Sequence, residues 1–571
     1  MLLSNLNLLA TAPGGVARLR ELILTLAVQG KLVPQDPADE PASVLLQKIR
    51  AEKDRLIAEG KIKKDKPLAA IAEEEEPFEL PDSWSWVALG EVIDIVRGIT
   101  FPANQKTKEA APGRIACLRT ANVQQIIEWD DLLFVDRSFM GREEQLIQHH
   151  DIVMSMANSR ELVGKVALIE HIPHAEATFG GFLGVLRPQK IDPRYAMAVL
   201  RNPYARSLLI DSSSQTTNIA NVSLAKLRPL PFPLPPEAEQ SRIVARVEEL
   251  MRLCDALEAK GRLEAAQHAQ LVSTLLGALT ASTTPDELAA NWQRVAQHFD
   301  LLLDRPEAID ALEQTLLQLA VRGLLVPQDP TDEPASALLQ KIRAEKDRLI
   351  ATGQIKRDKP LPPITDEEKP FELPVGWEWV RLLDLMPEFQ NGASSRGDSG
   401  GQLITVLRLA DIKEKRLSLA DTRQIPIAAP DIAKYRLVEG DILITRVNGS
   451  ADIVGQFNLC DRPVDAIYCD HFIRMRIDRR WFAPEFCALL GESALVRDSI
   501  KGLFITTAGQ KTVNQSHIGS LRLPLPPLAE QSRIVTRVTA LRRLCADLRQ
   551  RLAEREAVQA RLAEALVESV G

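Results

Sequence analysis

The sequence predicts an α+β protein in which two mixed α/β domains are separated by long antiparallel helices that form a coiled coil. Three observations support this prediction. The 571-residue chain repeats itself once, the repeated parts have the apolar spacing of helices, and the parts between them contain short β-type runs. Two long copies in one chain are typical of a pseudo-dimer, so we expect an approximate two-fold axis.

The repetition consists of two blocks in each copy. Residues 33–58 recur as residues 326–351 with two substitutions, and residues 235–244 recur as residues 526–535. The second block carries the motif Pro-Pro-x-x-Glu-Gln both times. A solenoid would have a shorter period and more repeats, so the chain is interpreted as two copies of one long module.

Each copy begins with a short helix followed by a charged one. Leu19 and Leu26 share one face of the first helix, which is expected to end at Gly30, and Gly323 is the counterpart of that glycine. A Pro-rich turn then leads into a second helix over residues 43–59, whose charged side we interpret as solvent-exposed.

Each copy ends with a long helix that starts after a Pro-Pro pair. Its apolar residues have the alternating spacing of a helix that packs along another helix. At about 44 residues and about 1.5 Å per residue, such a helix spans roughly 66 Å. The predicted helix-packing residues are Ile243, Val247, Leu250 and Leu257 in the first copy and Ile534, Val538, Leu541 and Leu548 in the second. After a weak stretch, the seams are expected to resume at Leu271, Leu275 and Ala278 and at Leu562 and Leu566.

The order of the helical pieces predicts a circular arrangement. In the middle of the chain, the long helix of the first copy runs directly into the leading helices of the second. At the termini the same two pieces are cut apart. Because chain termini often lie close together, we expect the N- and C-terminal helices to complete a second helical bundle.

The segments between the helices differ widely in sequence but share a skeleton. Strands are expected at residues 151–155, 165–169, 441–445 and 472–476. One scaffold with two divergent surfaces suggests one task performed on two targets. The predicted regions are 1–83 (helices and linker), 84–235 (first variable domain), 236–376 (central helices and linker), 377–527 (second variable domain) and 528–571 (C-terminal helix).

The net charge of −7 is unevenly distributed. Residues 84–235 hold 16 Lys/Arg and 15 Asp/Glu, and residues 377–527 hold 19 and 18, so each variable domain is close to neutral. The acidity therefore lies on the helical regions. A domain with balanced charge would bind nucleic-acid phosphates only weakly, so such a role would need partners with basic surfaces of their own.

The remaining composition predicts a cytoplasmic protein without a metal site. Six cysteines in this length imply no disulfide framework, no apolar run approaches the roughly 20 residues needed to cross a bilayer, and the leucine-rich start lacks the basic residue of a signal peptide. Cys460 and Cys469 are too widely spaced for a metal-binding pair, and His171 and His174 form a lone pair. We interpret both pairs as structural.

The repeated blocks resemble the specificity subunits of type I restriction–modification systems. The resemblance covers residues 18–571 and rests on two variable domains, each followed by a Leu-Pro-Pro-x-x-Glu-Gln helix, and on the Leu-Val-Pro-Gln-Asp-Pro lead-in. It implies two target recognition domains, each reading half of a bipartite double-stranded DNA target. It also implies that the helices set the spacer and dock two modification (methyltransferase) subunits, which restriction subunits join. S-adenosylmethionine and ATP with Mg²⁺ are expected in those partners, and no cofactor in this chain.

Motifs for chemistry in this chain are incomplete. Asn202-Pro203-Tyr204 lacks one Pro of the loop that holds a target amine, and the glycines of residues 179–182 lack cofactor-loop spacing. Residues 502–512 resemble a phosphate loop with an inserted Gln and wrong glycine spacing. We therefore expect a non-catalytic subunit.

Base edges and phosphates are read by Arg, Lys, Asn, Gln, Ser and Thr side chains on loops. The first variable domain offers Arg97, Asn158, Ser159, Arg160, Lys165, Thr216, Thr217 and Asn218. The second offers Gln390, Asn391, Arg396, Arg446, Asn448, Ser450, Thr506, Thr507, Gln510 and Lys511.

Two other classes of protein remain open alternatives. A coiled-coil adaptor that binds only proteins would explain the helices, but not two divergent β-rich domains on one scaffold. The other alternative is a remnant of a fused methyltransferase–nuclease, and the incomplete motifs count against it.

Overall fold

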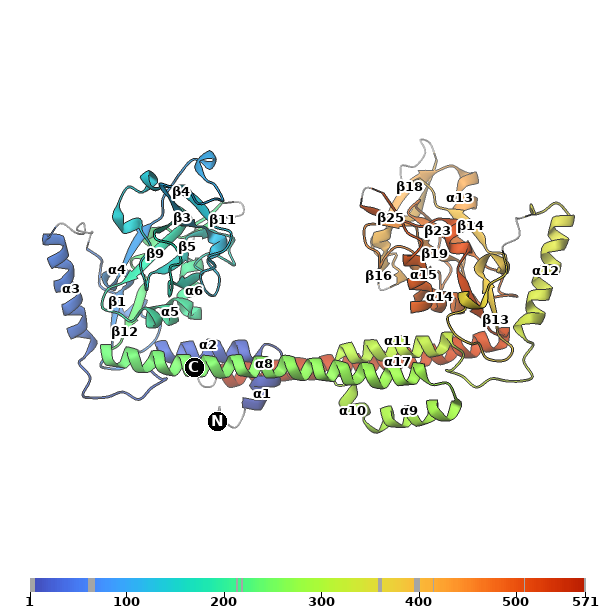
Figure 1. Cartoon of the computed structure of the whole chain (residues 1–571), viewed down its shortest axis with the longest axis horizontal. Helices are drawn as coiled ribbons and strands as arrows, with labels where there is room; N and C mark the ends of the chain where they lie inside the picture. The colour runs from blue at the N-terminus through green and yellow to red at the C-terminus, as the bar shows by residue number, and fades with distance from the viewer. Residues whose placement is uncertain are drawn as a thin grey trace. The chain divides into compact units, whose positions relative to one another are not determined.

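The computed structural model describes residues 6–59, 67–211, 214–216, 219–357, 362–394, 401–413, 415–507 and 509–568. The chain divides into two compact units (Figure 1). Unit 1 comprises Met1–Glu264 with Arg555–Gly571, and unit 2 comprises Ala265–Glu554. Two long helices, α8 (Glu237–Ala281) and α17 (Leu528–Glu568), each belong to both units, which confirms the two predicted long helices.

Unit 1 combines helices with a mixed domain of short strands. Its helices besides α8 and α17 are α1 (Leu6–Thr11), α2 (Gly15–Val28), α3 (Ala42–Ala58), α4 (Leu89–Val92), α5 (Pro193–Arg201), α6 (Pro203–Asp211) and α7 (Leu224–Leu227). Its strands are β1 (Ser85–Ala88), β2 (Ile93–Arg97), β3 (Arg114–Leu118), β4 (Leu133–Asp136), β5 (Ile152–Ser155), β6 (Ala157–Asn158), β7 (Val166–Leu168), β8 (Ala177–Phe179), β9 (Leu183–Pro188), β10 (Ser214–Thr216), β11 (Ile219–Asn221) and β12 (Pro231–Leu234).

Unit 2 repeats this order. Its helices besides α8 and α17 are α9 (Pro285–Gln297), α10 (Phe299–Leu302), α11 (Pro306–Val321), α12 (Ala335–Ala351), α13 (Ala429–Tyr435), α14 (Pro484–Glu492), α15 (Ala494–Lys501) and α16 (Gln515–Gly519). Its strands are β13 (Glu378–Arg381), β14 (Glu388–Asn391), β15 (Gln402–Leu407), β16 (Ile412–Lys413), β17 (Arg416–Leu417), β18 (Arg423–Ile427), β19 (Ile442–Thr445), β20 (Val447–Asn448), β21 (Phe457–Leu459), β22 (Ala466–Tyr468), β23 (Phe472–Arg476), β24 (Ile505–Thr507), β25 (Gln510–Thr512) and β26 (Arg522–Leu525).

The sheets of the two units share one topology. The central antiparallel sheet has the order β2-β9-β5-β7 in unit 1 and β14-β23-β19-β21 in unit 2. A second sheet is β4-β3-β8 or β18-β15-β22, and a third is β10-β11-β6 or β20-β25-β24. A pair, β1–β12 or β13–β26, closes each domain next to its long helix. The duplicated module is therefore present in both units, and unit 2 adds one further strand pair, β16–β17.

A buried carboxylate explains the Asp that precedes the central strand in each copy. Asp151 accepts two hydrogen bonds from the Arg187 guanidinium, at 2.7 and 2.8 Å, and one from a backbone N–H. Asp441 and Arg476 repeat this bidentate pair at 2.6 and 2.8 Å. The four predicted strands correspond to β5, β7, β19 and β23.

Each leading helix packs against both long helices within its own unit. In unit 1 the Arg20 guanidinium of α2 bonds to Asp255 and Glu258 of α8, and Arg18 pairs with Glu564 of α17 at 3.2 Å. In unit 2, Asp310 and Glu313 of α11 pair with Arg549 of α17 at 2.6 and 2.7 Å. The N-terminal helices thus lie beside the end of the C-terminal helix, which confirms the circular arrangement.

The predicted helix-packing residues all face partners inside their own unit. Ile243 and Val247 contact the core of the first variable domain, and Leu250 and Leu257 contact α2. The equivalents in α17 contact the second variable domain or α11: Ile534, Val538, Leu541 and Leu548.

The distal half of each seam differs from the prediction by one residue. Leu271 of α8 and Leu562 of α17 are exposed, at 44% and 50%. The buried residues are Val272, Leu276 and Leu279 in α8 and Ala563 in α17. A heptad pattern assumes about 3.5 residues per turn, whereas a straight α-helix has about 3.6, so the buried face drifts across the weak stretch.

The two repeated blocks meet in space. The buried Glu239 of the Glu-Gln motif accepts hydrogen bonds from Trp84 Nε1 at 3.0 Å and Gln35 Nε2 at 2.6 Å. Arg242 pairs with Asp39 at 2.5 Å. The second copy repeats all three contacts with Glu530, Trp377, Gln328, Arg533 and Asp332. In both copies these contacts join the lead-in turn, the first residues of the variable domain and the long helix. We call this set of contacts the clamp.

A glycine ends the leading helix in each copy, as predicted. Gly30 and Gly323 have positive φ angles of 69° and 72°. A Cβ at Gly30 would lie 2.5 Å from Cγ of Pro81, so the position also requires a close approach of the chain.

Among the described helices, none is long and apolar enough to span a membrane.

Candidate nucleic-acid interface

In unit 1 the predicted polar residues gather around the small sheet β10-β11-β6. Asn158 of β6 pairs with Ala220 of β11, and Thr216 of β10 pairs with Ile219. Arg97, at the end of β2, lines a cavity of about 120 Å³ together with residues of β6, β11 and the loop before β9. Two distant stretches of sequence are therefore brought to one surface.

The candidates in unit 1 differ in how free their side chains are. Arg97 and Arg160 are exposed. Lys165 is half-buried and donates to Gln124 Oε1, and Asn158 Oδ1 accepts from the Ser159 N–H at 2.9 Å. The last two side chains support the loop, so the two arginines are the groups best placed to meet a ligand.

Thr217, Asn218 and Arg396 lie outside the described residues. Thr216 is the last residue of β10.

In unit 2 the predicted residues share the equivalent sheet, β20-β25-β24. Asn448 and Thr506 both pair with Lys511, and Thr507 pairs with Gln510. Thr506, Thr507 and Gln510 are exposed. The strands thus present one polar surface from two separate stretches of sequence.

Other candidates in unit 2 hold the loops in place. Lys511 Nζ donates to Gly449 O at 3.0 Å, and Asn448 Oδ1 accepts from the Ser450 N–H at 2.9 Å. At the end of β14, Asn391 Oδ1 accepts from Gln515 Nε2 at 3.1 Å. The Gln390 amide donates to the carbonyl of its neighbour at 3.0 Å. Arg446 is half-buried, and its N–H donates to His471 O at 2.7 Å.

Strand pairing shows which residues occupy equivalent positions. Arg97 pairs with Gly184, the second residue of β9, and Asn391 pairs with Ile473, the second residue of β23. Arg97 and Asn391 therefore occupy equivalent positions. By the same register Ala220 corresponds to Lys511. At these two positions the side chains differ in size, charge and hydrogen-bonding capacity, whereas Asn158 and Asn448, the strand partners of Ala220 and Lys511, are identical.

Sequence reasoning missed one loop on this surface. Phe182 lies just before β9, is 66% exposed and lines the same cavity as Arg97. His471 occupies the corresponding place before β23, and its Nδ1 lies 3.2 Å from Asp470 Oδ1. The repeat of a short polar or glycine turn before each strand is the signal that could have identified this loop.

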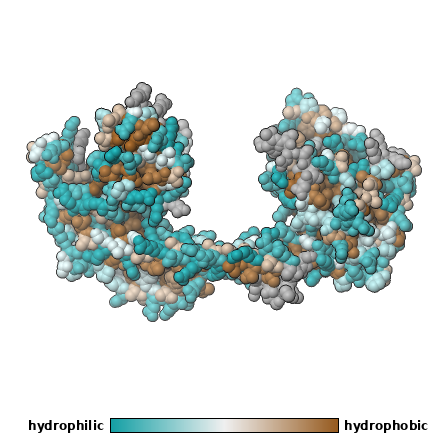
Figure 2. Space-filling model, turned by 180° about the vertical axis from the view of Figure 1, so that it is seen from behind, coloured by the Kyte–Doolittle hydropathy of each residue, from teal (hydrophilic) through white to brown (hydrophobic). Residues whose placement is uncertain are grey.

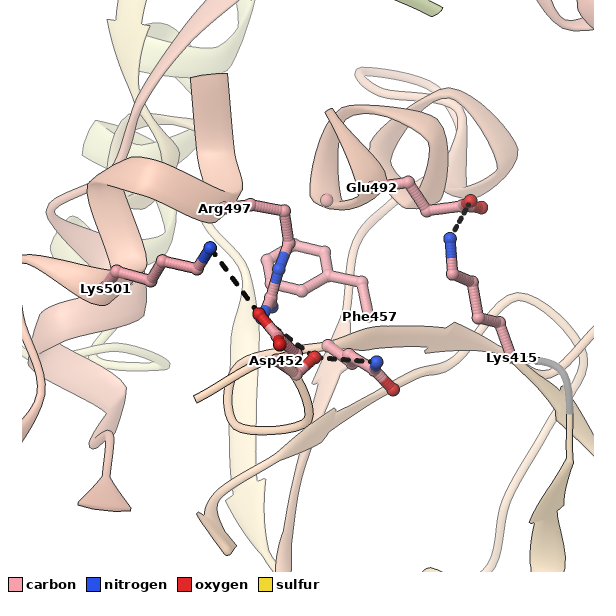
Figure 3. A pocket seen from close by; sticks show the side chains of 8 residues that line it. Lys415, Asp452, Phe457, Glu492, Arg497 and Lys501 are labelled. Atoms are coloured by element: carbon pink, nitrogen blue, oxygen red, sulfur yellow. Dashed lines mark hydrogen bonds and ion pairs between the residues drawn. The ribbon is translucent and has the colours of Figure 1, made fainter. Parts of the chain in front are cut away.

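The pocket of unit 2 shown in Figure 3 is structural. Its volume is about 210 Å³, and its charged groups are paired: Lys415 with Glu492 at 2.9 Å and Lys501 with Asp452 at 3.5 Å. Burial raises the pKa of Glu492, but Arg542 and Lys415 outweigh burial and hold that pKa below its ordinary value. Because Arg542 belongs to α17, this pocket ties the variable domain to the long helix.

One cluster has ligand-type side chains. Cys469, Asp470 and His471 place one potential ligand atom each within 4.8 Å of one another. Burial raises the pKa of the Cys469 thiol to about 11, which favours the neutral thiol over the metal-binding thiolate. We assign no metal to it.

Comparison with known proteins identifies related chains. The family model described as the type I restriction modification DNA specificity domain matches residues 81–268. The EcoEI type I restriction enzyme specificity subunit of Escherichia coli is 35% identical over 567 residues, covering 97% of this chain and 94% of that one. The EcoAI specificity subunit of Escherichia coli is 37% identical over 583 residues with the same coverages.

A solved structure has a related fold. It is described as the structural basis underlying complex assembly and conformational transition of the type I R-M system. The alignment has a TM-score of 0.50 at 18% identity and covers 86% of this chain and 99% of that chain.

Paired domains of one topology with different polar surfaces define a protein with two related but distinct binding domains. The chain belongs to the family of type I restriction enzyme specificity subunits. This membership favours DNA specificity over the protein-only adaptor and the fused-enzyme remnant.

Proposed function

We propose that the chain is the sequence-specific DNA-recognition subunit of a type I restriction–modification complex. Each variable domain reads one half of a bipartite, asymmetric double-stranded target. The observation that carries this proposal is the equivalence of the two polar sheets, β10-β11-β6 and β20-β25-β24, on which aligned positions such as Ala220 and Lys511 hold different side chains while Asn158 and Asn448 are the same. Different side chains at equivalent positions predict two different half-sites.

The side-chain types on these surfaces suit base and phosphate contacts. Exposed arginines such as Arg97 and Arg160 can bind guanine edges or phosphates, and Thr506, Thr507 and Gln510 can exchange hydrogen bonds with base edges. Phe182 adds an exposed aromatic ring to the same surface. The remaining candidates are proposed to support these loops or to make further contacts.

The near-neutral charge of the variable domains limits their own affinity for DNA. Because Lys and Arg contacts to phosphates supply most non-specific binding, a domain with balanced charge gains little from this source. We propose that modification subunits supply the missing basic surface. Two of them, and then restriction subunits, join this chain in the cytoplasm.

Catalysis is assigned to those partners. Family membership supports a non-catalytic role for this chain. We propose that S-adenosylmethionine is bound by the modification subunits and ATP with Mg²⁺ by the restriction subunits. The chain itself selects the target sequence and sets the spacing between its two halves.

The regions predicted from the sequence are retained as functional divisions. Residues 84–235 and 377–527 are the proposed target recognition domains, and residues 1–83, 236–376 and 528–571 the helical regions and linkers. The long helices α8 and α17 are proposed to fix the unspecified spacer between the half-sites.

The test is to sequence the methylated sites in DNA exposed to the reconstituted complex. The expected result is one bipartite motif with a fixed spacer. Exchanging residues 84–235 for the corresponding domain of another specificity subunit should change one half-site and leave the other intact. Random methylation, or a change in both half-sites, would contradict the proposal.

A further inference from the structure

A tight turn leads into a strand of the central sheet at the same place in both units. In unit 1 it comprises residues 180–183, after β8, and a backbone hydrogen bond of 2.8 Å joins its first and last residues. In unit 2 it comprises residues 469–472, after β22, and the corresponding bond is 3.0 Å long. The strands before the turns pair in parallel with β3 and β15. The two turns therefore occupy equivalent positions in the duplicated module.

The same backbone contacts hold both turns. The first residue of each turn donates its N–H to the neighbouring strand at 3.0 Å, and the carbonyl of the third accepts from the residue between β5 and β6 or between β19 and β20. The latter bonds are 2.8 and 2.7 Å long. The residues joined are Gly180 and Leu118, Met156 and Phe182, Cys469 and Leu407, and Arg446 and His471. Because only backbone groups take part, the third residue is held in the same way whatever its side chain.

A glycine directly after β2 or β14 permits a close approach to each turn. A Cβ at Gly98 would lie 2.2 Å from a carbonyl oxygen of the first turn, and a Cβ at Gly392 would lie 2.1 Å from one of the second. Only glycine fits at such distances. Arg97 and Asn391, both candidate DNA contacts, directly precede these glycines. The turns therefore lie beside the candidate interface in both units.

Phe182 is the third residue of the turn in unit 1. Its side chain is 66% exposed and lines the same cavity as Arg97. Hydrophobic residues are visible elsewhere on both units (Figure 2), so exposure alone does not distinguish Phe182. Its place does, because it puts an aromatic ring without hydrogen-bonding groups among the polar candidates for base contacts. Such a ring contributes an apolar contact to a ligand on this surface.

His471 places a hydrogen-bonding ring at the equivalent position of unit 2. Its Nδ1 lies 3.2 Å from Asp470 Oδ1 and 3.8 Å from Cys469 Sγ. An ionised carboxylate can only accept a hydrogen bond, so the closer contact places the proton on Nδ1 and leaves Nε2 as an acceptor. Among the described residues, none hydrogen-bonds to Nε2, and the side chain is exposed. This acceptor is therefore available to a ligand.

The strands around each turn have the form of a major-groove reader. The major groove of B-DNA admits a two-stranded β-ribbon, and β10–β11 and β24–β25 are antiparallel ribbons. The ribbon and the turn are tied together, because the residue that donates to the turn also accepts from the residue after the ribbon. These second bonds, from Val222 to Met156 and from Val513 to Arg446, are both 2.9 Å long. In that groove a thymine presents a methyl group, whereas adenine and cytosine present amino groups.

We propose that the third residue of each turn determines specificity within its own half-site. Phe182 packs against the C5-methyl group of a thymine, and His471 Nε2 accepts a hydrogen bond from the amino group of an adenine or a cytosine. This inference rests on the proposed function, which assigns one half-site to each unit, and it adds the base chemistry that is read at one equivalent position. One backbone with two kinds of ring makes the two units select different bases.

The first experiment removes the thymine methyl group. The complex of the full-length chain with its modification subunits is titrated with duplexes of its own methylated motif, in which deoxyuridine replaces one thymine at a time. In the half-site that changes when residues 84–235 are exchanged, one replacement should raise the wild-type Kd roughly threefold. Phe182→Ala should bind both duplexes equally. A half-site without thymine, an unchanged wild-type Kd at every position or continued discrimination by Phe182→Ala would overturn the role of Phe182.

The second experiment changes the ring of the other unit. His471→Phe should alter the preference at one base pair of the second half-site by roughly fivefold or more, because the amino group of the preferred base loses its acceptor. The first half-site should stay the same. Sequencing of methylated sites measures both half-sites. The role of His471 is overturned if the second half-site is unchanged or if both half-sites change.

The control is Leu301→Ala on α10, at a residue that is 62% exposed and lies outside the variable domains. It should leave both half-sites and the wild-type Kd unchanged, and thermal unfolding checks that every variant remains folded. A control that changes either half-site would mean that the turn variants act through the fold, and would also overturn the inference. The proposed function fails separately, when the wild-type complex methylates no bipartite motif.

Discussion

Glu239 carries a buried carboxylate between Trp84 and Gln35, and Glu530 repeats it. Both residues belong to the most repeated motif of the chain. Their role is to connect three elements that are far apart in sequence. A motif that would be interpreted as a helix start from sequence alone is therefore the point where the helix, the lead-in turn and the variable domain are joined.

Glu239→Ala should destabilise unit 1 by about 1–3 kcal/mol, because Trp84 Nε1 loses its acceptor inside the core. The matched control is Ser241→Ala, an exposed residue two positions further along the same helix. Chemical denaturation of both variants measures the difference in unfolding free energy. Equal stability of the two variants would mean that the clamp contributes nothing.

The same carboxylate should give a pH signature. Burial raises the pKa of Glu239, with Trp84 and Gln35 opposing the shift. A raised folded-state pKa means that the folded chain holds the proton more tightly. Its contribution to stability is therefore fully present below the unfolded pKa and is lost as pH rises through the folded pKa.

The unfolding free energy of the wild type minus that of Glu239→Gln should thus be largest in acid and should fall toward neutral pH. Denaturation curves at several pH values measure it. Glu492→Gln is the opposite control, because the pKa of Glu492 is lowered and its contribution is lost as pH falls. Parallel pH dependences for the two differences would contradict these assignments.

On the recognition surface, Arg97→Ala should affect one half-site only. An exposed guanidinium that reads a base should cost about 1–3 kcal/mol when removed and relax preference at one position. Sequencing of methylated sites measures this, and Asn391→Ala at the equivalent position of unit 2 should alter the other half-site. A uniform loss across all sequences would instead identify Arg97 as a phosphate contact.

Among the elements, the long helices and the central strands could be predicted because each carries its own periodicity. Residues 151–155 and 472–476 alternate or run apolar over strand-like lengths. The small sheets could not be predicted, because β6 and β20 are two residues long and form only through partners more than sixty residues away along the chain. For the same reason, the candidate DNA-contacting residues were predicted on separate loops and not on one small sheet in each unit.

The register of the distal seam gives an element-scale prediction. Leu276→Ala should destabilise unit 2 by about 2–4 kcal/mol, because Leu276 is 5% exposed within the core formed with α11. Leu271→Ala, the same substitution at a residue that is 44% exposed, should cost less than about 1 kcal/mol. Thermal or chemical unfolding of the two variants compares them directly. If Leu271→Ala were the more destabilising of the two variants, the heptad register expected from the sequence would be correct instead.

At the scale of the whole molecule, some parts of the duplicated module are the same in both units and others differ. The buried clamp residues and the outer faces of α3 and α12 are the same in both units, whereas the polar sheets differ. The sequence revealed that the copies existed, but not which exposed residues were held constant, because exposure is a property of the fold. The divergent polar sheets are therefore the surfaces that we propose contact DNA.

The proposed spacer function of α8 and α17 predicts a change in target spacing. A seven-residue insertion between Leu257 and Leu271, with a matched insertion between Leu548 and Leu562, lengthens each helix by about 10 Å, close to the rise of about three base pairs. Seven residues rotate a helix by only about 20° from whole turns, so both seams keep facing their partners. Three base pairs turn DNA through roughly 100° at about 10–10.5 base pairs per turn, so the variant should select a changed spacer or lose binding. Sequencing methylated sites measures the spacer, and an unchanged spacer with full activity would refute the role of the helices as a ruler.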